Sequence, residues 1–194
     1  GAYPHRARDV VAPLASIALG LPEVVRRTVP PLNGALLSIG TLTAGTGAPN
    51  VLPGTGRIYG TMRTTTAQDR VALAEAVSDL ASGVATAYGV RASIRFIRGE
   101  PVLANDALLA RATGEQLAVF GYEAAEPLRS LGADDFSHFT EAAPVLMAFV
   151  GVGGAGGAGA GAAPGEGREQ PPLHDSAFLP GDDAVQPVAE TLLA

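Results

Sequence analysis

The sequence predicts an α+β fold in which helices cover one face of an antiparallel sheet. Three observations support this fold class. Residues 73–88 carry apolar side chains at helical spacing, and residues 90–96 alternate between apolar and polar side chains. Residues 35–43 and 57–63 have the pattern of two strands joined by a Gly- and Pro-rich connection. The first half of the chain is therefore predicted to run helix, strand, strand, helix, strand.

The first helix is predicted to begin at Val10, with Asp9 as its N-cap. Val10, Leu14 and Ile17 share one helical face. Gly20 and Pro22 are expected to stop or kink this helix, because proline lacks the backbone donor that a helix interior needs.

The second helix is predicted to begin after Thr66, because Thr66 and Asp69 have the spacing of a capping box. Gly89 follows the last apolar residue of the pattern, where a left-handed glycine cap is expected. Residues 90–96 should then form a half-buried strand with one solvated face.

The second half of the chain is predicted to mix helices with strands. The expected elements are a helix over 107–120 capped by Asn105 or Asp106, a short strand over 127–131, a helical turn over 134–140, a buried strand over 145–151, and a last helix that begins at Asp182 or Asp183.

Composition excludes several classes of function. All 13 basic residues are Arg without a basic cluster, and the net charge is −6, so no nucleic-acid partner is expected. The longest apolar runs, 10–21 and 143–152, are too short or too interrupted to span a membrane. The chain has no Cys, which excludes disulfides and thiolate metal ligands and favours a reducing compartment; a cytoplasmic location is predicted.

Residues 151–156 fit the G-x-G-x-x-G pattern of dinucleotide-binding turns. That site needs a helix directly after the glycines, so that the helix N-terminus faces the pyrophosphate. Here the glycines run on into "AGAGAAPGEGREQPP", which cannot sustain a helix. The nucleotide interpretation is therefore rejected, and residues 153–167 are predicted to form a flexible Gly- and Ala-rich loop.

Four segments carry a more specific signal. They are "GAYPHRARD" (1–9), "GAPNVLPGTGRIYGTMRT" (47–64), "GADDFSHF" (132–139) and "PPLHDSAF" (171–178). In this order, over nearly the whole chain, they resemble the M20 metallopeptidase family, and within it the amidohydrolases that act on hippurate and N-acyl amino acids.

The resemblance implies an architecture. Residues 1–99 would be a lid and dimerisation domain of two helices on a four-stranded antiparallel sheet, with the first strand before or at Gly1. Residues 100–194 would be the C-terminal part of an α/β catalytic domain. The general-base glutamate and the other metal ligands are expected upstream of Gly1, so this chain alone is expected to be inactive.

The resemblance also implies cofactors and a ligand. The intact enzyme would hold two divalent metal ions, Zn or Mn, with none bound tightly by this chain alone. His174 stands in the "PLH" position of the last metal ligand, and imidazole nitrogen suits such metals. Without the motif, a single His in a loop would be a surface residue.

Substrate contacts are implied for two further positions. Asn50 and Arg63 resemble lid residues that reach the substrate, the guanidinium pairing with a carboxylate. The alternatives are a turn residue for Asn50 and an exposed strand end for Arg63. Asp134 and Asp135 resemble an acidic pair at the active-site edge, and helix capping is the alternative.

Two remaining histidines, His5 and His138, are expected to be structural or exposed. The function implied is metal-dependent hydrolysis of amide bonds in N-acyl amino acids or related small amides and peptides. The substrate would be a small molecule, and the protein is expected to form a homodimer through the lid. The alternative is a non-catalytic dimerisation or ligand-binding module of the same family.

Overall fold

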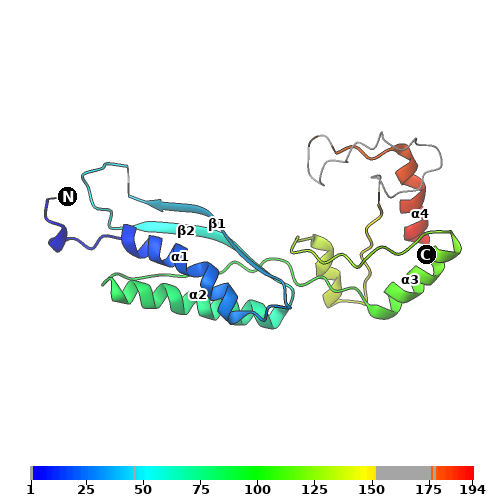
Figure 1. The fold of residues 1–194 in the computed structure, drawn as a ribbon, viewed down its shortest axis with the longest axis horizontal. Helices are drawn as coiled ribbons and strands as arrows, with labels where there is room; N and C mark the ends of the chain where they lie inside the picture. Colours follow the sequence, from blue (N-terminus) through cyan, green and yellow to red (C-terminus); the bar gives the residue numbers. More distant parts are fainter. Residues whose placement is uncertain (1, 46, 152–175, 177) are drawn as a thin grey trace. The chain divides into compact units, whose positions relative to one another are not determined.

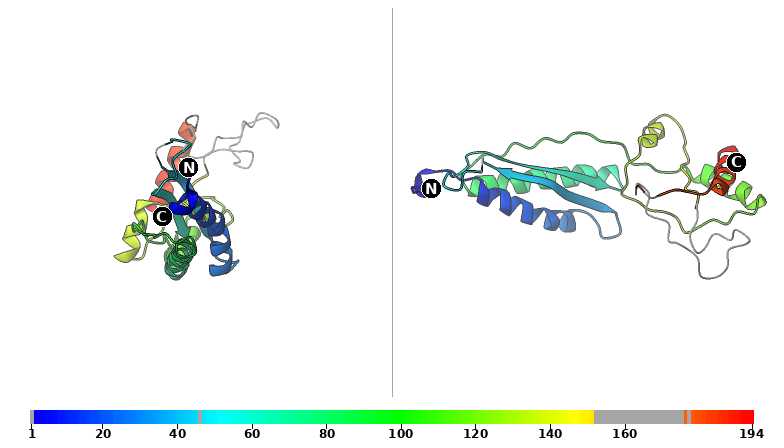
Figure 2. Two further views of the ribbon diagram at one scale, coloured as in Figure 1. Left: turned by 90° about the vertical axis from the view of Figure 1, so that its left-hand side faces the viewer. Right: turned by 90° about the horizontal axis from the view of Figure 1, so that it is seen from above.

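Two helices, α1 (Val11–Thr28) and α2 (Ala67–Ala87), lie against one face of a hairpin formed by β1 (Ala35–Ala44) and β2 (Gly56–Thr64). The computed structural model describes residues 2–45, 47–151, 176 and 178–194. Figure 1 shows both helices on the same side of the hairpin, and the view from above in Figure 2 shows them running along it. The predicted α+β layering of helices on an antiparallel sheet is confirmed for this part of the chain.

The hairpin has the antiparallel register that its sequence pattern predicts. Ala35 pairs with Thr64 at one end and Ala44 with Gly56 at the other, and a bulge lies between Ile39 and Thr41. Among the described residues the sheet contains these two strands. Residues 90–98 form no strand, so the strand predicted over 90–96 is not observed, and the sheet is two-stranded here rather than four-stranded. A period-2 pattern supplies the side chains of a strand but not the hydrogen-bonded neighbour that a strand requires.

Helix α1 does not stop at Gly20 or Pro22, so the stop that was one of the two expected outcomes is wrong. The helix continues for six residues beyond Pro22 and ends at Thr28. Gly20 instead permits close helix packing, because a Cβ there would lie 3.1 Å from the Leu80 side chain of α2. Leu21 and Val29 on either side of the last turns are 5% and 7% exposed. Tertiary burial therefore outweighs the single backbone hydrogen bond that proline removes.

Helix α2 has the predicted ends. The Thr66 hydroxyl accepts a hydrogen bond of 3.0 Å from the backbone N–H of Asp69, which is the N-cap interaction. At the other end Gly89 has a φ of +67°, a backbone conformation that only glycine adopts without strain. The backbone N–H of Val90 then bonds to the carbonyl of Ala85, which closes the helix. The core of this layer includes Leu73, which is fully buried.

The chain divides into two compact units. The first unit comprises Gly1–Val102 and Arg129–His138, and the second comprises Leu103–Leu128 and Phe139–Ala194. The first unit opens with a short turn, η1 (Pro4–Arg6). The second contains α3 (Ala107–Val119), η3 (Asp182–Ala184) and α4 (Val185–Leu193), and η2 (Asp135–Glu141) lies where the chain passes between the units.

The helices of the second half match their predictions better than its strands do. Asp106, rather than Asn105, caps α3, because its Oδ1 accepts from the backbone N–H groups of Leu108 and Leu109. Residues 127–131 and 145–151 form no strand, which corrects both predictions. Residues 145–147 do have a partner, since Asp106 N–H bonds to the Val145 carbonyl. The predicted loop over 153–167 lies outside the described residues.

None of the described helices is long and apolar enough to cross a membrane.

Candidate functional site

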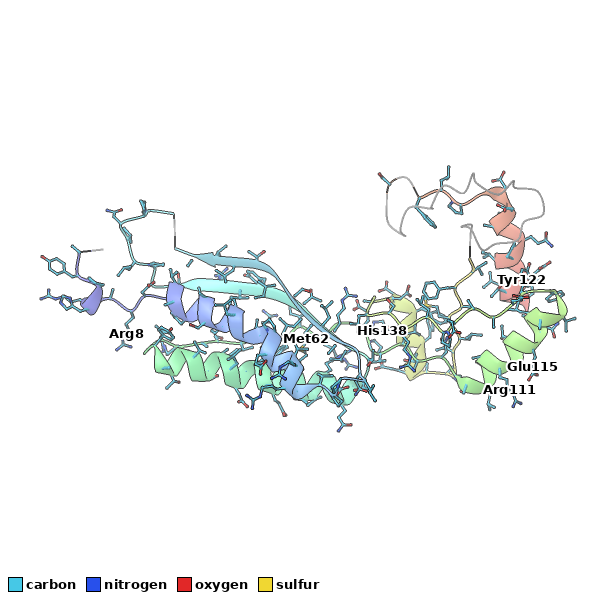
Figure 3. All side chains as sticks on the ribbon, in the orientation of Figure 1. Arg8, Met62, Arg111, Glu115, Tyr122 and His138 are labelled. Carbon is cyan, nitrogen blue, oxygen red and sulfur yellow. The ribbon has the colours of Figure 1, made fainter. Side chains whose placement is uncertain are left out.

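Arg63 lies near the end of β2 on the face of the hairpin that points away from the helices. Successive residues of a strand alternate between the two faces. A Cβ at Gly56 would meet Leu14 of α1, so the even-numbered residues of β2, which include the buried Thr64, face the helices and Arg63 faces away from them. Met62, labelled in Figure 3, marks this end of the strand. Arg63 is half-buried, and its Nη1 donates a 2.8 Å hydrogen bond to the backbone carbonyl of Leu131. The guanidinium is therefore a docked group rather than a freely solvated strand end.

Residues 129–138 return to the first unit beside this arginine. Gly34, at the entrance of β1, lies under the Leu131 side chain, and a Cβ on Gly34 would come within 3.4 Å of Leu131 Cδ2. Leu131 is thus held through its carbonyl by Arg63 and through its side chain at Gly34. This arrangement places the start of the Asp134–Asp135 segment at the Arg63 end of the hairpin.

Asp134 caps η2. Its Oδ1 accepts a 2.9 Å hydrogen bond from the backbone N–H of Phe136, and its carbonyl accepts from the N–H of Ser137. Asp135 is the first residue of η2. Both carboxylates are exposed. The capping alternative is confirmed for Asp134, while a role at the edge of an active site stays a prediction for both residues.

Asn50 is an exposed turn residue in the connection between the strands. That connection joins the Ala44 and Gly56 ends, whereas Arg63 is near the opposite end of β2. Seven residue steps at about 3.3 Å separate Gly56 from Arg63, so the two ends are roughly 23 Å apart. Within one chain the structure does not bring Asn50 and Arg63 together on one small substrate.

The three histidines fall in different places. His5 lies in η1, exposed, with its ring edge-on to that of Tyr3 at 6.2 Å between centroids. His138 is exposed in η2 (Figure 3). His174 lies outside the described residues. Across the part of the chain that the structure describes, no three His, Asp or Glu side chains gather closely enough to hold a metal ion.

In the second unit, Asn105 makes a contact that the sequence did not single out. Its side-chain amide donates to the carbonyl of Met147 at 2.9 Å and accepts from the N–H of Met147 at 2.8 Å. The Asn105 side chain thereby makes with the Met147 backbone the pair of hydrogen bonds that a residue of a neighbouring strand would make. The sequence suggested only a capping role for Asn105, because Asn is common at helix N-termini and Asn105 is next to the true cap, Asp106.

A second contact joins α4 to the end of α3. The Tyr122 hydroxyl donates to Glu190 Oε2, and Gln186 Nε2 donates to Glu190 Oε1 at 2.9 Å. The hydrogen bond from Tyr122, with that from Gln186, lowers the pKa of Glu190. The same carboxylate raises the pKa of Tyr122. Figure 3 labels Tyr122.

A pocket of about 260 Å³ lies between residues 146–150 and α4, where Val188 and Leu192 line it. Its lining is mainly apolar, with the Thr191 hydroxyl as a polar side-chain group.

Comparison with known proteins places this geometry in context. No family model matches the chain. Among solved structures, the YXEP protein of Bacillus subtilis, a dinuclear metal binding peptidase from the M20 family, matches with a TM-score of 0.77 and 26% sequence identity, over 95% of this chain and 44% of that one. The chain therefore has the fold of part of an M20 peptidase.

Sequence relatives point to the same family. N-acetylcysteine deacetylase of Bacillus subtilis strain 168 is 32% identical over 151 residues, which are 78% of this chain and 40% of the relative. N-acetyldiaminopimelate deacetylase of Shouchella clausii strain KSM-K16 is 27% identical over 198 residues, covering 100% of this chain and 48% of the relative. The resemblance to the M20 amidohydrolases is thus confirmed, and the chain spans about half the length of the curated relatives it matches.

Proposed function

We propose that this chain is part of a metal-dependent hydrolase that cleaves the amide bond of N-acyl amino acids or related small amides. The observation that carries the proposal is the agreement between a structural match to a dinuclear metal binding M20 peptidase and sequence matches to two deacetylases of N-acetylated amino acids. In this proposal residues 1–99 form the lid and residues 100–194 belong to the catalytic domain.

Arg63 is the residue that we propose to bind the substrate carboxylate. A guanidinium has five N–H donors in a planar fork, and the hydrogen bond to Leu131 occupies one of its two terminal nitrogens. The remaining donors can pair with a carboxylate, and the Leu131 carbonyl holds the plane of the fork while they do so. Asp134 and Asp135 would lie at the edge of the same site. Asn50 stays a proposed substrate contact, but it lies at the other end of the hairpin and would not touch the substrate molecule that Arg63 of the same chain binds.

His174 remains the proposed metal ligand. The described residues do not fit a metal centre by themselves, because they contain no cluster of three His, Asp or Glu side chains. We therefore assign no catalytic step to metal within this chain. The two metal ions, Zn or Mn, are proposed for the enzyme as a whole.

The natural full-length protein provides the test. Purified protein should release the acyl group from N-acetyl amino acids, lose this activity in a chelator, and regain it with Zn²⁺ or Mn²⁺. Amide hydrolysis that persists unchanged in the chelator, or no hydrolysis across a panel of N-acyl amino acids, would contradict the proposal. Arg63→Ala should raise KM more for a substrate with a free carboxylate than for its carboxamide.

We also propose that the first unit completes a four-stranded sheet and forms a homodimer. Among the described residues β1 pairs only with β2, so its other edge carries unpaired backbone groups, which favour strand addition. Residues 90–96 supply the alternation of a further strand, with Ile94 37% and Phe96 48% exposed. Sedimentation velocity should show a dimer, and a monomer at all concentrations would exclude this assembly. A cytoplasmic location stays a prediction.

A further inference from the structure

A buried carboxylate lies at the point where β2 passes into α2. Asp69 is 7% exposed. Its Oδ2 accepts a 2.7 Å hydrogen bond from Asn33 Nδ2 and a 2.6 Å hydrogen bond from the Thr66 hydroxyl. In a capping box the third residue of the helix bonds back to the N-cap backbone. Asp69 instead binds the N-cap hydroxyl and a residue 36 positions earlier, so it does more than close its own helix.

Asp69 joins two short segments, residues 33–34 before β1 and residues 64–66 at the end of β2, and the hydrogen bonds between these segments form the closure of the hairpin. Next to Asn33, the carbonyl of Gly34 accepts a 2.9 Å bond from the backbone N–H of Thr65, and the Thr65 hydroxyl accepts from the N–H of Gly34 at 3.1 Å. Next to Thr66, its carbonyl accepts a 2.8 Å bond from the Thr64 hydroxyl. The three threonines that follow Arg63 are therefore each fixed by a hydrogen bond.

The same closure sets the position of the Leu131 carbonyl. A Cβ at Gly34 would lie 2.8 Å from Thr65 Cγ2 and 3.4 Å from Leu131 Cδ2, so Gly34 is packed between these two side chains. Arg63 precedes the threonines that bond to Gly34, and Leu131, whose carbonyl accepts from Arg63, packs against Gly34. The hydrogen bonds between Gly34 and Thr65 therefore connect Arg63 to its acceptor. A shift of that closure would move the guanidinium and its acceptor relative to each other.

We propose that Asp69 is a positioning residue for Arg63: through Asn33 and Thr66 it holds the end of β2 so that the guanidinium stays on the Leu131 carbonyl with its remaining donors directed outward. This inference rests on the proposed role of Arg63 in binding a substrate carboxylate. Burying a carboxylate away from water is costly unless it is well hydrogen-bonded. Asp69 meets that condition with two donors from separate parts of the chain, Asn33 and Thr66. These hydrogen bonds fix the residues before β1 to the residues after β2.

The first test compares variants of the full-length protein on an N-acetyl amino acid and on its carboxamide. The variants are Asp69→Ala, the isosteric Asp69→Asn, Arg63→Ala, and Asp79→Asn as the control, since Asp79 is an exposed carboxylate on the same helix. Asp69→Ala should lower the carboxylate-to-carboxamide preference in kcat/KM by about tenfold through KM, with kcat on the carboxamide nearly unchanged. Asp69→Asn keeps an oxygen acceptor and should fall between Asp69→Ala and wild type, and Asp79→Asn should match wild type.

The second test does not require activity. Nitrogen-15 NMR of the arginine side chains reports rotation of the Arg63 guanidinium about the Cζ–Nε bond. That rotation should become faster in Asp69→Ala, with Asp69→Asn as the backup variant if Asp69→Ala does not fold. Asp79→Asn should leave it unchanged.

The two tests separate the proposals. If wild type hydrolyses neither substrate, the proposed function fails, and the NMR comparison still decides whether Asp69 positions Arg63. An Arg63 signal that is the same in wild type and in the folded Asp69 variants would overturn the inference. The inference would also be overturned if the preference for the carboxylate substrate survived Asp69→Ala but was lost in Arg63→Ala. A preference that Arg63→Ala leaves intact would overturn it as well, because Arg63 would then not bind the carboxylate.

Discussion

Arg63 and Leu131 are 68 positions apart in the chain, yet Arg63 Nη1 donates a 2.8 Å hydrogen bond to the Leu131 carbonyl. The bond fastens residues 129–138 to the end of the β1–β2 hairpin. It joins the residue proposed to bind a substrate carboxylate to Leu131, which is three residues before the acidic pair Asp134–Asp135 in the chain.

Gly34→Ala should destabilise the first unit. Its new Cβ would lie 2.8 Å from Thr65 Cγ2 and 3.4 Å from Leu131 Cδ2, which is overpacking that costs about 1–3 kcal/mol of unfolding free energy. Gly83→Ala is the matched control, because no atom lies within 4 Å of a Cβ at Gly83 inside α2. That variant should be stabilised by roughly 0.5–1 kcal/mol through helix propensity. Urea unfolding of both variants measures the difference, and equal effects would contradict the packing described.

Leu73→Ala should be among the most costly substitutions in the first unit. Leu73 is 0% exposed, and truncating a fully buried leucine costs about 2–5 kcal/mol. Val71→Ala, two residues away on the same helix, removes a side chain that is 61% exposed and should change stability by less than about 0.5 kcal/mol. Urea midpoints distinguish them; a small effect for Leu73→Ala would place the core elsewhere.

Asn105→Ala should loosen residues 145–147. Both hydrogen bonds between the Asn105 amide and the Met147 backbone would be lost, at a cost of about 1 kcal/mol because this site is exposed to water. The direct readout is amide hydrogen exchange, which should become faster at Met147. Gln116→Ala, an exposed amide on α3, serves as the control and should leave that rate unchanged. An unaltered Met147 rate in Asn105→Ala would contradict the strand-like role.

Tyr122→Phe should reduce stability in a pH-dependent way. The pKa of Glu190 is lowered by its hydrogen bonds, so its contribution is present above its unfolded-state pKa and is lost as pH falls through the lower folded value. The pKa of Tyr122 is raised by Glu190, so that contribution is present below the unfolded-state value and is lost as pH rises through the higher folded value. The Tm difference between wild type and Tyr122→Phe should therefore be largest from about pH 5 to about pH 9.

The control for this pH series is Tyr3→Phe, which removes the hydroxyl of an exposed tyrosine. Its Tm should follow wild type at every pH. A Tyr122→Phe difference that stays constant down to pH 2 would show that the Glu190 carboxylate is not the group that responds.

Features that depend on a few neighbouring residues could be predicted from the sequence. Thr66 caps α2 and Gly89 ends it, because a cap needs only its own side chain and the backbone two or three residues away. The hairpin followed from two β-rich segments around a Gly- and Pro-rich connection. The order of four short motifs was enough to indicate the M20 amidohydrolases, and the deacetylase relatives confirm it.

Features that depend on partners far along the chain were decided by the tertiary structure. Helix α1 runs through Pro22 because burial of Leu21 and close packing at Gly20 outweigh a local break. Residues 90–96 alternate apolar and polar side chains as a strand does, but within the described part of the chain no strand pairs with them. Arg63 meets Leu131, and Asp69 meets Asn33, because folding brings distant backbone and side-chain groups within hydrogen-bond range. Local pattern determines what a segment can become, and long-range contacts decide what each of its groups binds.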